Sequence, residues 1–143
     1  MNHPLTLGDS VLDEDHLRLE DLVLQLRDAP LDEVSRRLEA VREHASRHFA
    51  LEDIELRAMA DGNAKCHLDE HAAVLNSLDE VMVVLTQVDV AAEKKALLIN
   101  RLATELLVWL PGHVHEMDAG VASHRSKQRF GGAPVKIARR PGT

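Results

Sequence analysis

The sequence has few of the residues that stabilise small domains through disulfide bonds or aromatic packing. Among its 143 residues are one Cys, no Tyr, one Trp and two Phe. A single cysteine, Cys66, excludes an internal disulfide and is typical of a reducing compartment. Hydrophobic residues nevertheless make up 45% of the chain. We therefore expect one domain with a core built mainly from Leu, Val and Ala.

Helix breakers and long apolar runs are also scarce. Gly and Pro are rare before residue 110 and runs of β-branched residues are short, which favours helices over strands. The longest apolar runs, VMVVL and LLVWL, are far shorter than the roughly 20 residues of a membrane-spanning helix. The N-terminal stretch MNHPLTLGDSVLDED lacks the basic and apolar parts of a secretory signal. We expect a helical protein of the cytoplasm with no membrane partner.

Charge divides the chain into two parts. Residues 1–120 hold all 24 acidic residues and 11 of the 17 basic ones, a net charge of −13, which argues against binding of nucleic acid. Residues 121–143 hold six basic residues and no acidic one. We expect residues 1–120 to form the folded domain and residues 121–143 to be a flexible basic tail. An alternative role for this tail is docking to an acidic partner.

Four segments of helical periodicity lie between the turn signals APLD, DGN and VDVA. Apolar residues recur in each at steps of three and four. The predicted helices cover residues 10–28, 32–60, 65–88 and 91–120, with Asp9 or Ser10 as the first N-cap. Because short connections make sequential helices antiparallel, the sequence predicts an all-α, up-down-up-down four-helix bundle.

Histidines and one glutamate interrupt the apolar stripes of all four predicted helices. They are His16 in the first, His48 and Glu52 in the second, His67 and His71 in the third, and His113 in the fourth. Polar side chains on an inner helix face are costly unless they are paired or bind a metal. In an antiparallel bundle, the starts of the first and third helices share a layer with the ends of the second and fourth. We therefore expect these side chains to converge at one end of the bundle.

The residue types and their number indicate a metal centre. Imidazole with carboxylate suits iron, zinc or copper. Six or seven ligands are too many for one tetrahedral zinc, and two metal ions account for them better. Haem is disfavoured because the sequence has no Cys-x-x-Cys-His motif.

The stretch WLPGHVHEMD holds two histidines and two acidic residues close together. The apolar stripe of the fourth helix runs on to His113 rather than to His115. On a straight α-helix Glu116 shares the face of His113, whereas Asp118 lies about 140° away. Pro111 removes one backbone hydrogen bond and is expected to bend or loosen this turn. Helix geometry alone thus leaves open which acid joins His113.

The motif order His16, HFALE, HLDEH and HVHEMD resembles the hemerythrin family in its bacterial single-domain form, over about residues 7–120. The resemblance implies two iron ions at one end of the bundle. It assigns His67, His71 and His113 to one iron, His16 and His48 to the other, and Glu52, Asp118 and an oxo or hydroxo group as bridges. His115 and Glu116 would then be outer or surface groups.

The resemblance implies a non-haem di-iron protein that binds dioxygen reversibly, for storage, delivery or sensing. Five neutral imidazoles and two carboxylates should stabilise high-valent iron less than a carboxylate-rich site, which favours holding O₂ over cleaving it. Phe49 and Trp109 are the candidates to line an O₂ pocket. The alternatives are a di-iron enzyme acting on peroxide or nitric oxide, and an iron-binding or interaction module.

Two further residues lie near the candidate ligands. His44, one turn before His48, lies beside the stripe and is expected to flank the site rather than to bind metal. Cys66 precedes His67 and is expected to be a buried small hydrophobic residue. A redox-active thiol is the alternative for Cys66.

Overall fold

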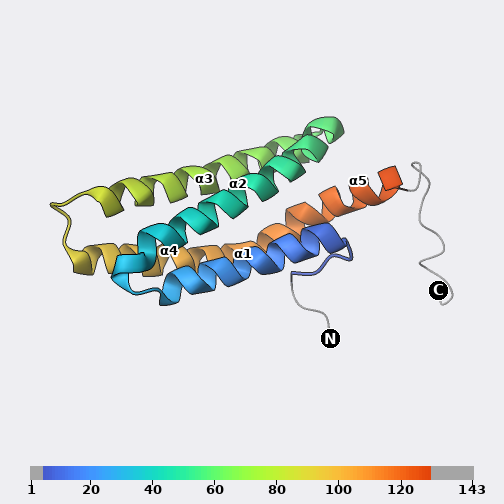
Figure 1. Ribbon diagram of the computed structural model, residues 1–143. Helices are drawn as coiled ribbons and strands as arrows, with labels where there is room; N and C mark the ends of the chain where they lie inside the picture. Colours follow the sequence, from blue (N-terminus) through green and yellow to red (C-terminus); the bar gives the residue numbers. More distant parts are fainter. Residues whose placement is uncertain (1–4, 130–143) are drawn as a thin grey trace.

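The helices of the protein lie antiparallel to one another in a bundle, as the computed structural model shows for residues 5–129 (Figure 1). Their bounds are α1 (Ser10–Asp28), η1 (Leu31–Glu33), α2 (Val34–Met59), α3 (Gly62–Thr86), α4 (Ala92–His113), η2 (Val114–Asp118) and α5 (Ala119–Arg129). Over the described residues there is no strand. The predicted all-α four-helix bundle is confirmed, and the first helix has the predicted bounds.

Local sequence explains where the helices begin and end. The Asp9 carboxylate accepts hydrogen bonds from the amides of Val11 and Leu12, which caps α1. Asp61 caps α3 in the same way, through the amide of Ala64. Before that cap, α2 ends at Ala60 in the left-handed conformation (φ 51°), which reverses the chain within two residues. The tight connection keeps α2 and α3 antiparallel neighbours.

The core is aliphatic, as the composition predicted. Helix α1 packs against α2 and α4, and α2 packs against α3. The fully or almost fully buried side chains at its centre include Leu26, Leu38, Val41, Ala45 and Leu78. They recur at helical spacing, so each helix turns one apolar face inward and its charged face to solvent.

The last helix continues beyond the predicted domain boundary at residue 120. Helix α5 packs against α2 and η2, and Val121 is fully buried with Leu12, Leu56 and Ala64. Arg125 pairs with the α1 cap Asp9 at 2.7 Å. Basic residues accumulate after residue 120, but they do not end the helix, which continues to Arg129. The remainder of the predicted tail, residues 130–143, lies outside the described residues.

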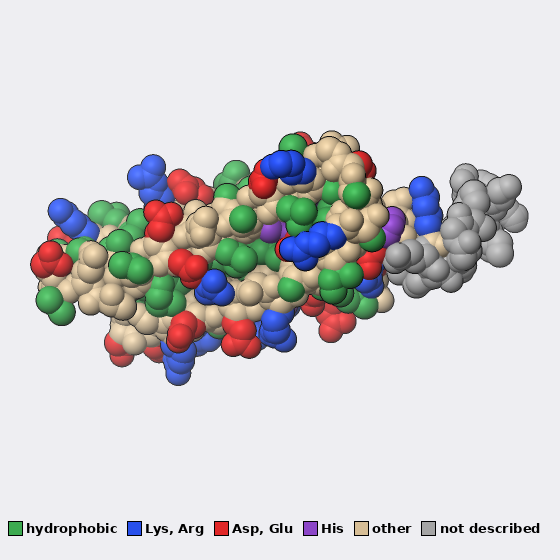
Figure 2. All heavy atoms as spheres, turned by 90° about the horizontal axis from the view of Figure 1, so that it is seen from above, with side chains coloured by type: hydrophobic (Ala, Val, Ile, Leu, Met, Phe, Trp, Pro, Cys, Tyr) green, Lys and Arg blue, Asp and Glu red, His purple; other side chains and the backbone are tan. Residues whose placement is uncertain are grey.

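Charged side chains of both signs cover the surface around the apolar interior. On the face seen in Figure 2, acidic and basic groups flank a strip of hydrophobic side chains, and little histidine is visible. Among residues 5–129, no helix combines the length and the apolar character needed to cross a bilayer.

Candidate metal centre

The bundle brings seven polar side chains together near one end, from α1, α2, α3 and the α4–η2 segment. They are His16, His48, Glu52, His67, His71, His113 and Asp118, and each is at most 4% exposed. These are the residues that the sequence indicated as ligands. Their convergence follows from the antiparallel order, which places the starts of α1 and α3 beside the ends of α2 and α4.

The seven side chains form two clusters that could each hold a metal ion. The three-histidine group contains Glu52, His67, His71, His113 and Asp118; the two-histidine group contains His16, His48, Glu52 and Asp118. In each group the ligand atoms lie within 4.8 Å of one another. The Nε2 atom of His113 is 3.2 Å from Nε2 of both His67 and His71. Nitrogens bound at about 2.1 Å and at right angles to one ion would be about 3 Å apart.

Glu52 and Asp118 belong to both groups, and each carboxylate directs one oxygen toward the three-histidine group and the other toward the two-histidine group. Oε1 of Glu52 lies 3.1 Å from His71 Nε2, while its Oε2 lies 3.1 Å from His48 Nε2. Oδ1 of Asp118 lies 2.7 Å from His67 Nε2, while its Oδ2 lies 2.8 Å from His16 Nε2. Each carboxylate therefore stands between the two groups.

Buried polar atoms of the centre lack hydrogen-bond partners among the described residues. They are both oxygens of Glu52, both oxygens of Asp118, both ring nitrogens of His16 and Nε2 of His48. Such atoms cost about 1–3 kcal/mol each when buried without a partner, and more when charged. Cations between the two carboxylates would satisfy them, so the donor set fits metal ions.

The electrostatics of the centre also favour positive charge. Burial by itself would lower the pKa of His16, but the Asp118 and Glu52 carboxylates outweigh burial and raise this pKa to about 9. Burial would raise the pKa of both Glu52 and Asp118, yet the surrounding imidazoles lower both values. The two carboxylates are thus ionised and favour a proton on His16, and the pKa of His48 beside Glu52 is raised as well.

A single π-helical turn places Asp118 beside His113. Residues Val114–Asp118 form η2, a π-helix, in which the amide of Ala119 donates to the carbonyl of Val114 five residues earlier. On a straight α-helix Asp118 would lie about 140° from His113. The wider turn returns it to the same face, with Asp118 Oδ1 3.1 Å from His113 Nε2. His115 and Glu116 are exposed, so the acid that joins His113 is Asp118.

Three outer carboxylates orient histidines of the centre, and sequence analysis did not identify this role for any of them. Nδ1–H of His48 donates to Asp15 at 3.0 Å, that of His71 to Asp53 at 2.8 Å, and that of His113 to Glu70 at 2.6 Å. Glu70 Oε1 also accepts from Trp109 Nε1 at 2.8 Å. A proton held on Nδ1 leaves Nε2 as the nitrogen that binds metal and fixes the ring plane.

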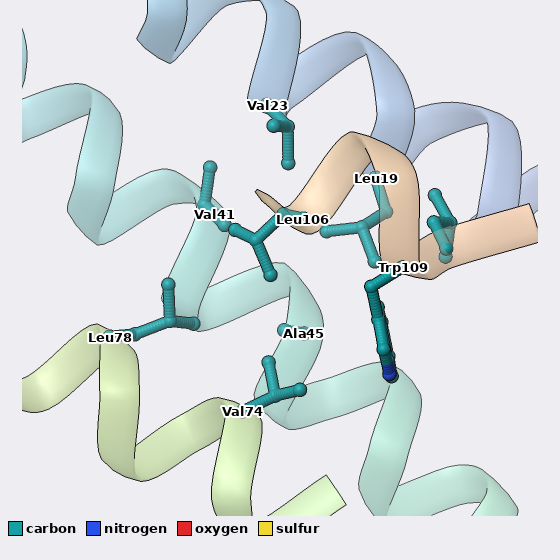
Figure 3. A pocket seen from close by; sticks show the side chains of 9 residues that line it. Leu19, Val23, Val41, Ala45, Val74, Leu78, Leu106 and Trp109 are labelled. Atoms are coloured by element: carbon teal, nitrogen blue, oxygen red, sulfur yellow. The ribbon is translucent and has the colours of Figure 1, made fainter. Parts of the chain in front are cut away.

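A small apolar cavity lies one helical turn from the centre, on the side of the bundle middle. Its volume of about 10 Å³ leaves room for one molecule of the size of water. Figure 3 shows side chains from α1, α2, α3 and α4 pointing into it. The lining residues are Leu19, Val23, Val41, Ala45, Val74, Leu78, Leu106, Trp109 and Leu110. Trp109 also stacks on the His113 ring, with 4.3 Å between ring centroids.

The structure separates the two aromatic residues that were expected to line a pocket. Trp109 lines the cavity, whereas Phe49 stacks face to face on His71, with ring centroids 4.0 Å apart and planes 8° from parallel. Phe49 therefore packs against the ring of a histidine of the three-histidine group.

The positions predicted for His44 and Cys66, which lie near the centre in the sequence, compare differently with the structure. His44 lies outside both groups, as expected, and its Nε2–H donates to the Asp15 carbonyl at 2.9 Å. The expectation that Cys66 is buried is wrong, because Cys66 is exposed. Ala64, His67 and His71 form the inner face of α3, and Cys66, one residue before His67, is rotated by about 100° from that face.

Comparisons with known proteins give one consistent result. The family model described as "Hemerythrin HHE cation binding domain" matches residues 7–123. The chain is 33% identical over 114 residues to a bacteriohemerythrin from Ralstonia nicotianae, which covers 80% of this chain and 79% of that protein. No solved structure gives a significant match.

Proposed function

Because the chain belongs to the hemerythrin family, we propose that it is a non-haem di-iron protein that binds dioxygen reversibly at the buried centre. One observation carries this proposal: Glu52 and Asp118 each have one oxygen in the three-histidine group and the other in the two-histidine group. Carboxylates that lie between two sets of imidazoles are arranged to bridge two ions. One metal would leave half of these oxygens without a partner.

The chain's own residues define the roles within such a centre. His67, His71 and His113 would hold one iron, and His16 and His48 the other. Glu52 and Asp118 would bridge the irons, together with an oxo or hydroxo group of solvent origin. Bound iron would supply reversible electron transfer to dioxygen. The two-histidine group offers four ligand atoms against five in the other group, which leaves more room for an exogenous ligand on its iron.

The apolar cavity supports dioxygen as that ligand. Leu19, Ala45 and Val74 each lie three residues from a histidine of the centre, so the cavity is one turn away from it. An apolar cavity remains dry, because its walls offer water no hydrogen-bond partners. Water excluded in this way cannot deliver protons or displace a weakly held ligand.

The experiment uses the full chain loaded anaerobically with ferrous iron and then exposed to air. We expect a coloured adduct that forms with O₂ and disappears under vacuum, over repeated cycles. Immediate oxidation without an adduct, with steady consumption of added peroxide, would instead establish the enzyme and overturn reversible binding.

A matched pair of variants tests the part played by the cavity. Ala45→Val adds two methyl groups inside it, whereas Ala50→Val adds them on the exposed face of the same helix. We expect the Ala45 variant to bind O₂ more slowly with unchanged iron content, and the Ala50 variant to behave like the parent protein. Equal O₂ binding rates in the two variants would remove the cavity from the proposal.

A further inference from the structure

A second cavity, here called the vestibule, opens at the end of the bundle that holds the centre. It lies between the α2–α3 connection and the η2–α5 segment and has a volume of about 310 Å³. The residues that line it are Leu56, Met59, Asp61, Asn63, Ala64, Cys66, His67, Glu116, Met117 and Gly120. It is therefore far larger than the apolar cavity, and its walls contain polar and sulfur groups.

The vestibule reaches a residue of the metal centre. His67 forms part of its wall and is 2% exposed, and its Nε2 lies 2.7 Å from Oδ1 of Asp118. The imidazole of His67 thus lies both in the vestibule wall and in the three-histidine group. On the other side of the centre, the apolar cavity has no charged or hydrogen-bonding side chain facing it except the indole of Trp109. The two cavities offer routes of opposite polarity to one centre.

The vestibule wall carries atoms that bind cations. Asp61 and Glu116 contribute carboxylates, Asn63 an amide oxygen, and Met59 and Met117 thioethers. Oxygen and sulfur donors of this kind bind divalent metal ions weakly when they are not gathered into a fixed shell. The net charge of the whole chain, −7, further concentrates cations at the surface.

We propose that the vestibule is the port through which ferrous ions enter and leave the centre, passing His67. The proposal rests on the proposed function, because it concerns the same iron centre. Iron cannot cross the apolar cavity without losing its hydration shell, whereas the vestibule lets it stay hydrated or bound to wall atoms until imidazole replaces water. Cys66 is exposed on the vestibule wall, so a bulky group on its sulfur would obstruct the port without touching a ligand.

The test compares rates of iron movement with and without such a group. Full-length protein is alkylated at Cys66 with a bulky maleimide, and Cys66→Ser protein treated in the same way is the control. Ferrous uptake is followed anaerobically, and iron release is followed with excess bathophenanthroline disulfonate. We expect both rates to fall at least tenfold in alkylated protein, with about two irons per chain at the end point.

A second variant blocks the port independently of thiol chemistry. A Cβ at Gly120 would meet only the Met59 methyl group, at 3.9 Å, so Gly120→Leu extends into the vestibule without a backbone clash. Ser123→Leu, at an exposed position on the same helix outside the vestibule, is its matched control. We expect slow uptake and release in the Gly120 variant alone, also with unchanged final iron content.

The outcomes separate the two proposals. Full iron content with unchanged rates in both the alkylated protein and the Gly120 variant would overturn the port and leave the proposed function standing. If alkylation lowers the final iron content, the Gly120 variant decides the question. Normal rates of iron uptake and release in that variant would overturn the proposal that the vestibule is the port. Failure of unmodified protein to take up two irons would overturn the proposed function and the port with it.

Discussion

Deletion of Glu116 should leave the candidate metal centre in place, although it removes a residue between His113 and Asp118. Glu116 lies within η2, where backbone hydrogen bonds span five residues instead of four. Without it the segment can form an ordinary α-helical turn. Its side chain is exposed, so the deletion removes no core contact.

The geometry gives the size of the effect. Each residue of an α-helix advances by about 100° and 1.5 Å. After the deletion Asp118 is the fourth residue beyond His113 and lies about 40° from it, close to its place in the π-turn. A deletion in the regular part of α4 has the opposite result. Val108 is 76% exposed, and its removal turns His113 and the residues after it by about 100° relative to the core face that carries Leu102.

The assay measures iron per chain after anaerobic ferrous loading, the ferric charge-transfer absorption after oxidation, and helicity by circular dichroism. We expect about two irons and an unchanged spectrum for the Glu116 deletion, and loss of iron for the Val108 deletion. The reasoning is refuted if the Glu116 deletion remains fully helical and yet loses its iron. An α-helical turn could then not replace the π-turn in placing Asp118 beside His113.

The remaining predictions concern the outer carboxylates, the last helix and the metal. Glu70→Ala should lower iron affinity about 10–100-fold, measured by chelator competition. Glu70→Gln keeps an oxygen that accepts from Trp109 and His113, so its iron affinity should fall only a few-fold. The exposed Glu80→Gln is the control, and equal losses of affinity in all three variants would contradict the positioning role of Glu70. Val121→Ala should lower the free energy of unfolding by about 2 kcal/mol in urea titrations, because it removes two fully buried methyl groups. Truncation after residue 129 should retain the iron, whereas truncation after residue 120 should lower the melting temperature; equal melting temperatures would exclude a stabilising role for α5. Removal of iron should lower the melting temperature by calorimetry, since metal binds only the folded chain; free iron at about 100 times its Kd adds roughly 2.7 kcal/mol.

The fold was predictable because helical periodicity persists over many turns. In α1 the residues Leu12, His16, Leu19, Val23 and Leu26 were expected inward, and all five are buried. Turn signals at both ends then set its bounds. The same periodicity located the histidines, because a polar residue on an apolar stripe is conspicuous only when the stripe is long.

The π-turn could not be predicted because it alters the spacing over one turn only. Pro111 indicated a disturbance, since it leaves the Leu107 carbonyl without its usual donor, but not its form or position. The turn begins after Pro111, at Val114. Only the match of Asp118 to a known family pattern pointed to the acid that lies beside His113, because a straight helix would place Glu116 on that face.

The outer carboxylates were missed for a different reason. Asp15, Asp53 and Glu70 lie beside inward residues in the sequence, where charged residues are ordinarily solvated. Their partners His48 and His113 belong to other helices, so no spacing within one helix reveals the pairs. Glu70 precedes His71 directly, yet it binds His113 on α4. Such pairs depend on how the helices are packed, which periodicity does not specify.

The most direct test of the central claim is an anaerobic titration of metal-free protein with ferrous iron, followed by bound iron per chain. Shared carboxylates predict saturation at two irons per chain, and at no more than one in the Asp118→Ala variant, in which both groups lose a ligand. Saturation at one metal ion in the parent protein, with Asp118→Ala unchanged, would contradict a centre in which Glu52 and Asp118 join two metal sites.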